Sequence, residues 1–242
     1  MKRWILLLCC ILLALSVTGC TGESSSSGSS SEPSSSQTQL QEDPVDPETA
    51  AALELVAEAD CEVPDFLTEE QQTLYRKAYT AYKQFALYTD GFGSTEYNPV
   101  MVEEYDNSFC VGNGSITTWK DYETAMLGLF TPDYLEELNL TVTELEDGTT
   151  LRYAHFADYQ GQLAFSDGAR GSNITYLGPD AFELISQTED EIRFYVIGTY
   201  QDYVENEAGE LVQEGEITQQ KYEIVLTHTE NGWRFSKFAL TI

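Results

Sequence analysis

Basic residues are scarce in this chain. Its 242 residues include 12 lysines and arginines against 41 aspartates and glutamates, a net charge of −29. A surface this acidic repels phosphate backbones and anionic lipid headgroups, which argues against nucleic acid as a partner and against electrostatic docking on a membrane. The acidity either keeps the protein soluble or steers it toward a basic partner.

Metal-binding residue types are also few. Three of the five cysteines lie within the first 20 residues, and the other two form no short-spaced cluster with the two histidines. This argues against a structural zinc site. The acidic run at 202–216 lacks the ligand spacing of a calcium-binding EF-hand. We therefore expect no metal and no cofactor.

Long hydrophobic runs are missing as well. The single candidate, near the start, is about 14 residues long and follows two basic residues, which is typical of a signal peptide and too short to span a bilayer. Residues 17–20, "VTGC", resemble the lipobox of bacterial lipoproteins, in which diacylglycerol is attached to the cysteine and the chain is cut before it. The resemblance implies a signal peptide at 1–19 and lipidation at Cys20. Ordinary secretion, with cleavage near Gly19, is the alternative, and both place the mature domain outside the cytoplasm.

Serine and glycine dominate the segment that follows Cys20. Such a composition has no apolar side chains to offset the entropy of ordering, so we predict a disordered tether at 20–45. Removing 1–19 takes away two basic residues and no acidic one, which leaves a charge of −31. The predicted location is the outer face of a bacterial cell membrane, reached through the lipid on Cys20.

Two cysteines remain in the mature domain, Cys61 and Cys110. In an oxidising compartment they are candidates for a disulfide that would close a loop of about 50 residues and contribute about 3–4 kcal/mol. The alternative is a pair of buried thiols.

Helices are predicted in the first half of the domain. Asp46 followed by Pro47 is typical of a helix start, so the segment 46–66 is expected to hold a short helix and a connector. A capping box at Thr68 predicts a helix over about 69–88, and Thr118 and Thr131 begin two further helices. The main domain is predicted to span 67–242.

Strand patterns replace helical ones in the second half. Long β-branched and aromatic runs alternate with turn-like "QTEDE", "ENEAGE" and "TENG", which predicts an antiparallel meander. Helices followed by a long twisted sheet indicate the α+β class, with the helices packed on the concave face of the sheet.

Three stretches together resemble a known group of folds: "TTWKDYETAMLGLFTPDYLEEL", "YQGQLAFSDGARG" and "ENGWRFSKFAL". Over 67–242 the chain resembles the nuclear transport factor-like and cystatin-like domains, and more narrowly the secreted bacterial inhibitors of DL-endopeptidases. The resemblance implies a non-catalytic domain that restrains a cell-wall hydrolase. It assigns no site residue to a numbered position.

A proteinaceous inhibitor needs a preorganised loop with aromatic anchors and a polar rim. The segment 91–114 offers Phe92, Tyr97, Tyr105 and Phe109, and Glu103 and Glu104 would complement a basic cleft. The alternative is that these aromatic side chains pack the loop against the core. The segment itself is predicted to be a loop with one or two short strands.

Two other classes of function stay open. A small-ligand binder would use a pocket between helices and sheet, with Tyr79, Tyr82, Tyr195 and Tyr200 as candidate lining residues or, alternatively, as core. An enzyme would need a general-base pair such as His155 and Asp158, but residues three apart in a strand point to opposite faces. We therefore expect a non-catalytic binding domain.

Overall fold

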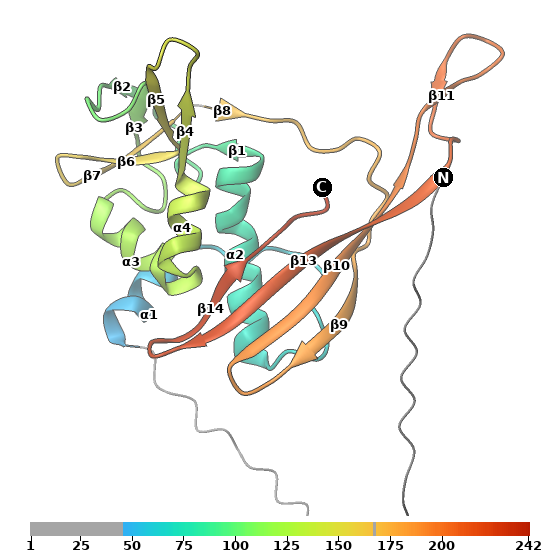
Figure 1. Cartoon of the computed structure of the whole chain (residues 1–242), viewed down its shortest axis with the longest axis horizontal. Coiled ribbons are helices and arrows are strands. Elements are labelled where there is room, and N and C mark those ends of the chain that lie inside the picture. The colour runs from blue at the N-terminus through green and yellow to red at the C-terminus, as the bar shows by residue number, and fades with distance from the viewer. Residues whose placement is uncertain (1–45, 167) are drawn as a thin grey trace, which may run out of the picture. The chain divides into compact units, whose positions relative to one another are not determined.

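The structure is a computed structural model of the chain and describes residues 46–166 and 168–242 (Figure 1). The predicted signal peptide at 1–19, the lipidation at Cys20 and the tether at 20–45 lie outside the described residues. The described part combines helices with antiparallel strands, which confirms the predicted α+β class.

Four helices occur in the described part of the chain. They are α1 (Pro47–Leu53), α2 (Glu69–Ala86), α3 (Trp119–Leu129) and α4 (Pro132–Asn139). The predicted capping box is present at α2, where Gln71 N donates to Thr68 Oγ1 at 3.3 Å and Thr68 N to Gln71 Oε1 at 3.0 Å. At α3, Asp121 N donates to Thr118 Oγ1 at 3.1 Å. Each cap satisfies a backbone N–H that has no partner within the helix.

The largest sheet has four antiparallel strands in the order β14-β13-β10-β9. Its members are β9 (Ala181–Gln187), β10 (Glu191–Gln201), β13 (Ile217–Thr229) and β14 (Gly232–Lys237). A small hairpin of β11 (Val204–Glu205) and β12 (Leu211–Val212) extends from the ends of β10 and β13 (Figure 1). This is the predicted meander. Phe194 lies opposite Ile224, and Leu226 lies opposite Phe235, all four of them buried.

The other strands form separate small sheets, where the sequence had predicted one long sheet. A second four-stranded sheet has the order β2-β3-β7-β6, and β4 pairs with β5 and β1 with β8. The bounds are β1 (Tyr88–Thr89), β2 (Asn98–Val100), β3 (Phe109–Val111), β4 (Leu140–Glu144), β5 (Thr150–Ala154), β6 (Phe156–Tyr159), β7 (Gln162–Phe165) and β8 (Gly168–Ala169). The second sheet forms because β7 pairs with β3, more than fifty residues earlier in the chain. The strands β2 and β3 confirm the short strands predicted within 91–114.

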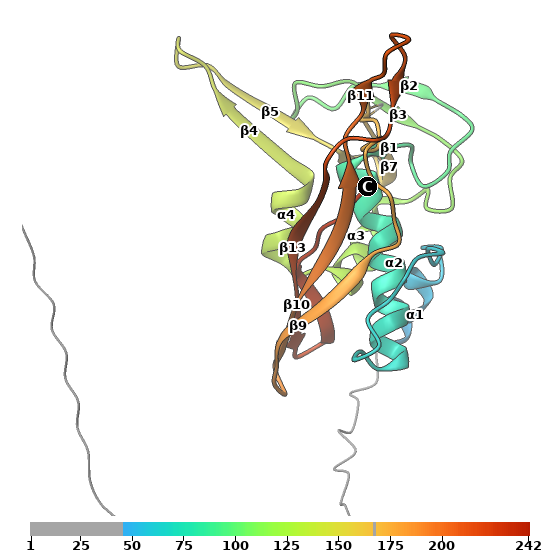
Figure 2. The ribbon, with the colours of Figure 1, turned by 90° about the vertical axis from the view of Figure 1, so that its right-hand side faces the viewer.

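The core lies between α2 and the large sheet, which run alongside each other in Figure 2. Tyr75 of α2 is 1% exposed and contacts the rings of Phe182, Phe194, Phe235 and Phe238, with centroids 5.2–6.3 Å apart. Along β10, buried and half-buried residues alternate without interruption, as a sheet with one covered face requires. Each buried aromatic side chain contributes roughly 1.5–3 kcal/mol.

The segment 46–66 belongs to the same core. Ala52 and Val56 are buried in the main hydrophobic cluster, and Ser115 Oγ donates to Leu55 O at 2.8 Å. The helix α1 lies against α3 at Gly128, where a Cβ atom would be 3.0 Å from the Thr49 side chain. The structured domain therefore includes α1, whose role the sequence did not indicate.

Candidate functional site

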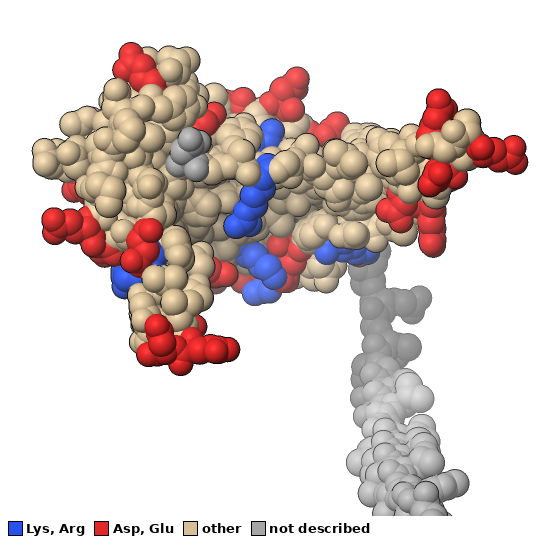
Figure 3. All heavy atoms as spheres, turned by 90° about the horizontal axis from the view of Figure 1, so that it is seen from above, with Lys and Arg blue, Asp and Glu red and all other residues tan. Residues whose placement is uncertain are grey.

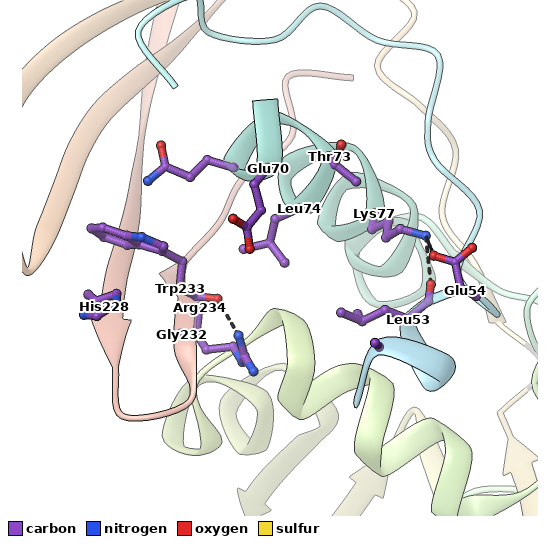
Figure 4. A pocket seen from close by; sticks show the side chains of 12 residues that line it. Leu53, Glu54, Glu70, Thr73, Leu74, Lys77, His228, Gly232, Trp233 and Arg234 are labelled. Carbon is purple, nitrogen blue, oxygen red and sulfur yellow. Dashed lines mark hydrogen bonds and ion pairs between the residues drawn. The ribbon is translucent and has the colours of Figure 1, made fainter. Parts of the chain in front are cut away.

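A pocket of about 200 Å³ lies between α1, α2 and the β13–β14 hairpin (Figure 4). Its apolar wall includes Leu53 of α1, Leu74 of α2 and Trp233 of β14. His228 of β13 lies opposite Trp233 across the hairpin, with ring centroids 4.9 Å apart. The pocket thus has two aromatic rings on one side and helix side chains on the other.

Lys77 is a buried cation in the wall of this pocket, with 8% of its surface exposed. Its ammonium donates to Leu53 O at 2.9 Å and to Val56 O at 3.1 Å, and lies 3.7 Å from Glu54 Oε1. The last carbonyls of a helix lack intrahelical donors and carry partial negative charge, so the end of α1 is a favourable place for a lysine. Lys77 therefore binds α1 to α2 and places a positive charge beside the cavity.

Arg234 is a second buried cation of the pocket, 6% exposed. Its Nε donates to Leu127 O at 2.6 Å and its Nη1 to Trp233 O at 2.7 Å. Burial lowers the pKa of the Arg234 guanidinium, and the carboxylate of Asp46 opposes this change. A guanidinium remains protonated in proteins, so the charge persists.

Acidic side chains complete the pocket. Glu54 of α1 and Glu70 of α2 both line it, and in Figure 4 the Glu70 side chain extends from α2 toward β14. The pocket therefore combines two cations, two carboxylates and an indole ring. Such a set can bind a small molecule that carries both polar groups and an apolar face.

The four tyrosines predicted for a pocket do not line this one. Tyr79 is buried in the core, and Tyr82 packs against the Phe238 ring at 5.3 Å. Tyr200 is buried and donates to Thr241 O at 2.6 Å. Tyr195 is half-buried on the opposite face of β10, with the Lys221 ammonium 5.4 Å from its ring centroid. The prediction was wrong for Tyr195 because residues five apart in a strand face opposite sides.

The predicted partner-binding aromatics in 91–114 divide into two groups. Phe92 and Phe109 are buried, and Phe92 stacks on Phe156 with centroids 5.6 Å apart, so neither is available to a partner. Tyr105 is half-buried against Phe109. Tyr97 is 46% exposed and is available to a partner.

The predicted acidic rim of the same segment is exposed. Glu103 is exposed, and Glu104 is exposed and pairs with Arg152 at 3.3 Å. Met101, which the sequence analysis did not single out, is 73% exposed between Tyr97 and these acids. No pattern in the sequence distinguishes such a methionine from one in the core.

Close backbone contacts hold this segment in place. Gly91 has a φ of +61°, and a Cβ atom there would lie 2.4 Å from the Phe165 ring; at Gly114 it would lie 1.8 Å from Gly91 O. The side chain of Asn113 accepts a hydrogen bond from Thr95 N at 2.9 Å. Glycine is therefore required at both positions, and the loop is preorganised.

The candidate general-base pair does not form. His155 precedes β6, and its Nδ1 lies 3.0 Å from Thr89 Oγ1, whereas Asp158 accepts from Gly161 N at 2.6 Å in the β6–β7 turn. The two side chains therefore have different partners, as the strand geometry predicted.

The candidate disulfide is not formed either: the structure has no bond between Cys61 and Cys110. Cys61 lies after α1 near Arg76, and Cys110 lies on β3 opposite Phe165. Both are half-buried, and burial raises the pKa of the Cys61 thiol to about 11. The backbone position of Cys110 is fixed by the pairing of β3 with β2 and β7.

The pocket residues were missed by the sequence analysis, although a signal exists for one of them. Lys77 lies three residues after Leu74 and one before Ala78, which places it beside the apolar face of α2. Arg234 and Trp233 carry no such signal, because their role depends on α1 lying beside β14.

No protein-family model matches this chain, and no curated protein matches it. In the described part, no helix combines the length and the apolar character needed to cross a bilayer.

Proposed function

We propose that this chain is an extracytoplasmic lipoprotein of the bacterial cell envelope, anchored through Cys20, with a non-catalytic domain that binds a small envelope molecule. The main support for a binding site is the pocket, where Lys77 and Arg234 are buried beside the indole of Trp233. Both cations are held by backbone carbonyls, so their charges are fixed before a ligand arrives. The separation of His155 from Asp158 removes the general-base pair that the sequence had offered.

The proposed ligand is a soluble cell-wall fragment that consists of a sugar ring and a short peptide. The apolar face of a sugar stacks on an indole, and its hydroxyl groups bind carboxylates such as Glu54 and Glu70. The amino and carboxyl groups of the peptide match the two signs of charge in the pocket. This proposal follows from the kinds of side chain present and from the predicted location.

The test measures melting temperature and binding heat of the mature chain with purified wall fragments, using Cys20→Ser to keep the protein soluble. A ligand at a concentration one hundred times its Kd stabilises the folded domain by about 2.7 kcal/mol. For a domain of this size, the melting temperature then rises by roughly 5–10 °C. Ala50 lines the pocket and is exposed, so Ala50→Phe fills the pocket without entering the core. The matched control is Ala51→Phe, an exposed position on the same helix outside the pocket lining.

We expect the shift in the parent chain and in Ala51→Phe, and its loss in Ala50→Phe. Equal shifts in both variants would place the ligand elsewhere. The absence of any shift with the folded parent chain would contradict the wall-fragment proposal.

A second candidate function is inhibition of a cell-wall DL-endopeptidase, as the resemblance implies. The observation in its favour is the preorganised segment 91–114, which exposes Tyr97 and Met101 beside Glu103 and Glu104. The same sequence resemblance leads us to propose the nuclear transport factor-like or cystatin-like fold for this domain. The packing of α2 on a four-stranded antiparallel sheet supports it.

Hydrolysis of peptidoglycan by purified DL-endopeptidases tests this candidate. We expect saturable inhibition that weakens with salt, because the acidic rim would face a basic cleft. Tyr97→Ala combined with Met101→Ala should weaken inhibition at least tenfold. The control is Tyr203→Ala, an exposed tyrosine of a different segment. Full hydrolysis in the presence of the folded domain would eliminate the candidate for those enzymes.

A further inference from the structure

The β4–β5 hairpin stands away from the rest of the domain in Figure 2. One of its two outer edges is already occupied. On β5, Arg152 N donates to Asp106 Oδ2 at 2.7 Å and Arg152 O accepts from Asp106 N at 2.8 Å. Ala154 is held in the same way by the side-chain amide of Asn107, with contacts of 2.9 and 3.1 Å. The segment before β3 therefore occupies the edge of β5.

The edge of β4 is open. No other described strand pairs with β4 besides β5. In an antiparallel pair, directly opposed residues point their N–H and C=O groups either both toward each other or both away. Arg152 points its groups away from β4, and its opposite residue is Val142, so Val142 also points its N–H and C=O outward. Glu144, two residues later, has the same orientation.

The sequence of β4 favours strand pairing. Thr141, Val142 and Thr143 are all exposed, and Val142 is 52% exposed. β-Branched residues are enriched in paired strands. Natural edge strands are protected by proline, charged side chains, bulges or short length. β4 has no proline, lysine or bulge, and its charged residue, Glu144, is the last of its five residues.

Acidic residues surround this edge. Glu136 and Glu137 lie at the end of α4, and Glu144, Glu146 and Asp147 lie at the hairpin end. Figure 3 shows red side chains at the tip of this projecting hairpin. The hairpin's own cation, Arg152, is paired with Glu104. A second copy of this chain would bring like charges together, so the charge favours a basic partner.

We propose that β4 is a docking edge for an extended, lysine- or arginine-bearing segment of another envelope protein, which adds to the hairpin as a third strand. Main-chain hydrogen bonds to Val142 and Glu144 supply affinity, as in other cases of strand addition. The surrounding carboxylates select basic side chains on the added strand. The proposal does not involve the pocket, and it uses the segment 91–114 only as the element that occupies the edge of β5.

The test uses a defined probe, an acetylated and amidated heptapeptide of alternating lysine and valine. Backbone amide exchange of the mature chain, with Cys20→Ser, is followed by NMR. At a peptide concentration ten times Kd, exchange of the Val142 amide should slow about tenfold, because exchange then occurs from the free fraction. High salt should reduce the protection.

Two pairs of controls separate strand addition from charge attraction alone. Val142→Pro removes the outward N–H and leaves the bonds of Thr141 and Thr143 to β5 intact, whereas Val142→Thr keeps the N–H. We expect binding to be lost in the first and kept in the second. A peptide that is N-methylated at alternate residues keeps its charge, cannot complete the ladder and should not protect Val142.

Three results would overturn the proposal. These are unchanged exchange of Val142 at saturating peptide, equal binding of the N-methylated peptide, and protection that rises with protein concentration in the absence of peptide. The last would show that the edge pairs with a second copy. Unchanged exchange of the Thr143 amide in Val142→Pro verifies that the hairpin itself is retained.

Discussion

The hydroxyl of Tyr134 joins α4 to the C-terminal segment across 104 residues of sequence. It donates to Phe238 O at 2.9 Å and accepts from Phe238 N at 2.9 Å, and both residues are buried. Burial raises the pKa of Tyr134 far above its usual value, so the hydroxyl stays protonated and can donate. Tyr134→Phe removes this one oxygen and leaves the ring in place.

The expected loss of stability is larger than for an ordinary Tyr→Phe substitution. Without the hydroxyl, the N–H and C=O of Phe238 both lose their partner in a buried site, and each such group costs about 1–3 kcal/mol. The variant should therefore lose about 2–6 kcal/mol, a large part of the 5–15 kcal/mol typical of a domain. The melting temperature should fall by roughly 4–24 °C, at about 2–4 °C per kcal/mol for a domain of this size.

Urea unfolding followed by tryptophan fluorescence and circular dichroism measures this loss. The midpoint should fall with no change in slope, because the surface exposed on unfolding is the same. Tyr203→Phe, at an exposed position, should change stability by less than about 0.5 kcal/mol. A loss below about 0.5 kcal/mol in Tyr134→Phe would refute the argument, since it would mean that water or a shifted backbone satisfies Phe238.

Three further predictions concern other buried polar groups. Burial lowers the pKa of His155, and the nearby Arg170 lowers it further. The unfolded chain therefore binds this proton more readily than the folded chain, and the free energy of unfolding should fall as the pH drops through about 6.5. Urea unfolding at pH 7.5 and at pH 5 should show a smaller fall for His155→Gln than for the parent chain. With a pKa of about 11, the Cys61 thiol should react with a disulfide reagent at pH 8 roughly a hundredfold more slowly than an ordinary cysteine, and urea should abolish the difference. Lys77→Met removes the side-chain donor of Val56 O, and one of the two donors of Leu53 O, which also accepts from Val56 N. It should cost about 1–3 kcal/mol in urea unfolding, against less than about 0.5 kcal/mol for the exposed Lys120→Met.

The starts of the helices could be predicted because their chemistry is local. Thr68 and Gln71 are three residues apart and satisfy each other's backbone groups whatever lies elsewhere in the chain. The alternation along β10 and β13 is local in the same sense. Local patterns of this kind therefore predict the class of the fold and the approximate bounds of its main helices and strands.

The candidate sites depend on contacts between distant residues, which local patterns do not contain. Phe92 and Tyr97 lie in one glycine-rich segment, yet Phe92 is in the core and Tyr97 is exposed, because only Phe92 faces Phe156. Whether Cys61 and Cys110 form a bond depends on whether two distant elements bring their side chains together, and in the structure no bond joins them.

The helix α1 is at once the first structured element of the described chain and one wall of the pocket. If the chain is anchored at Cys20, any tension between membrane and domain is applied first at residue 46, at the start of α1. Resistance to that pull comes from the Lys77 bonds to Leu53 O and Val56 O and from the Ser115 bond to Leu55 O. The Lys77 bond to Leu53 O belongs both to this attachment and to the wall of the pocket. A molecule bound in the pocket would therefore stiffen the point at which an anchor at Cys20 would pull.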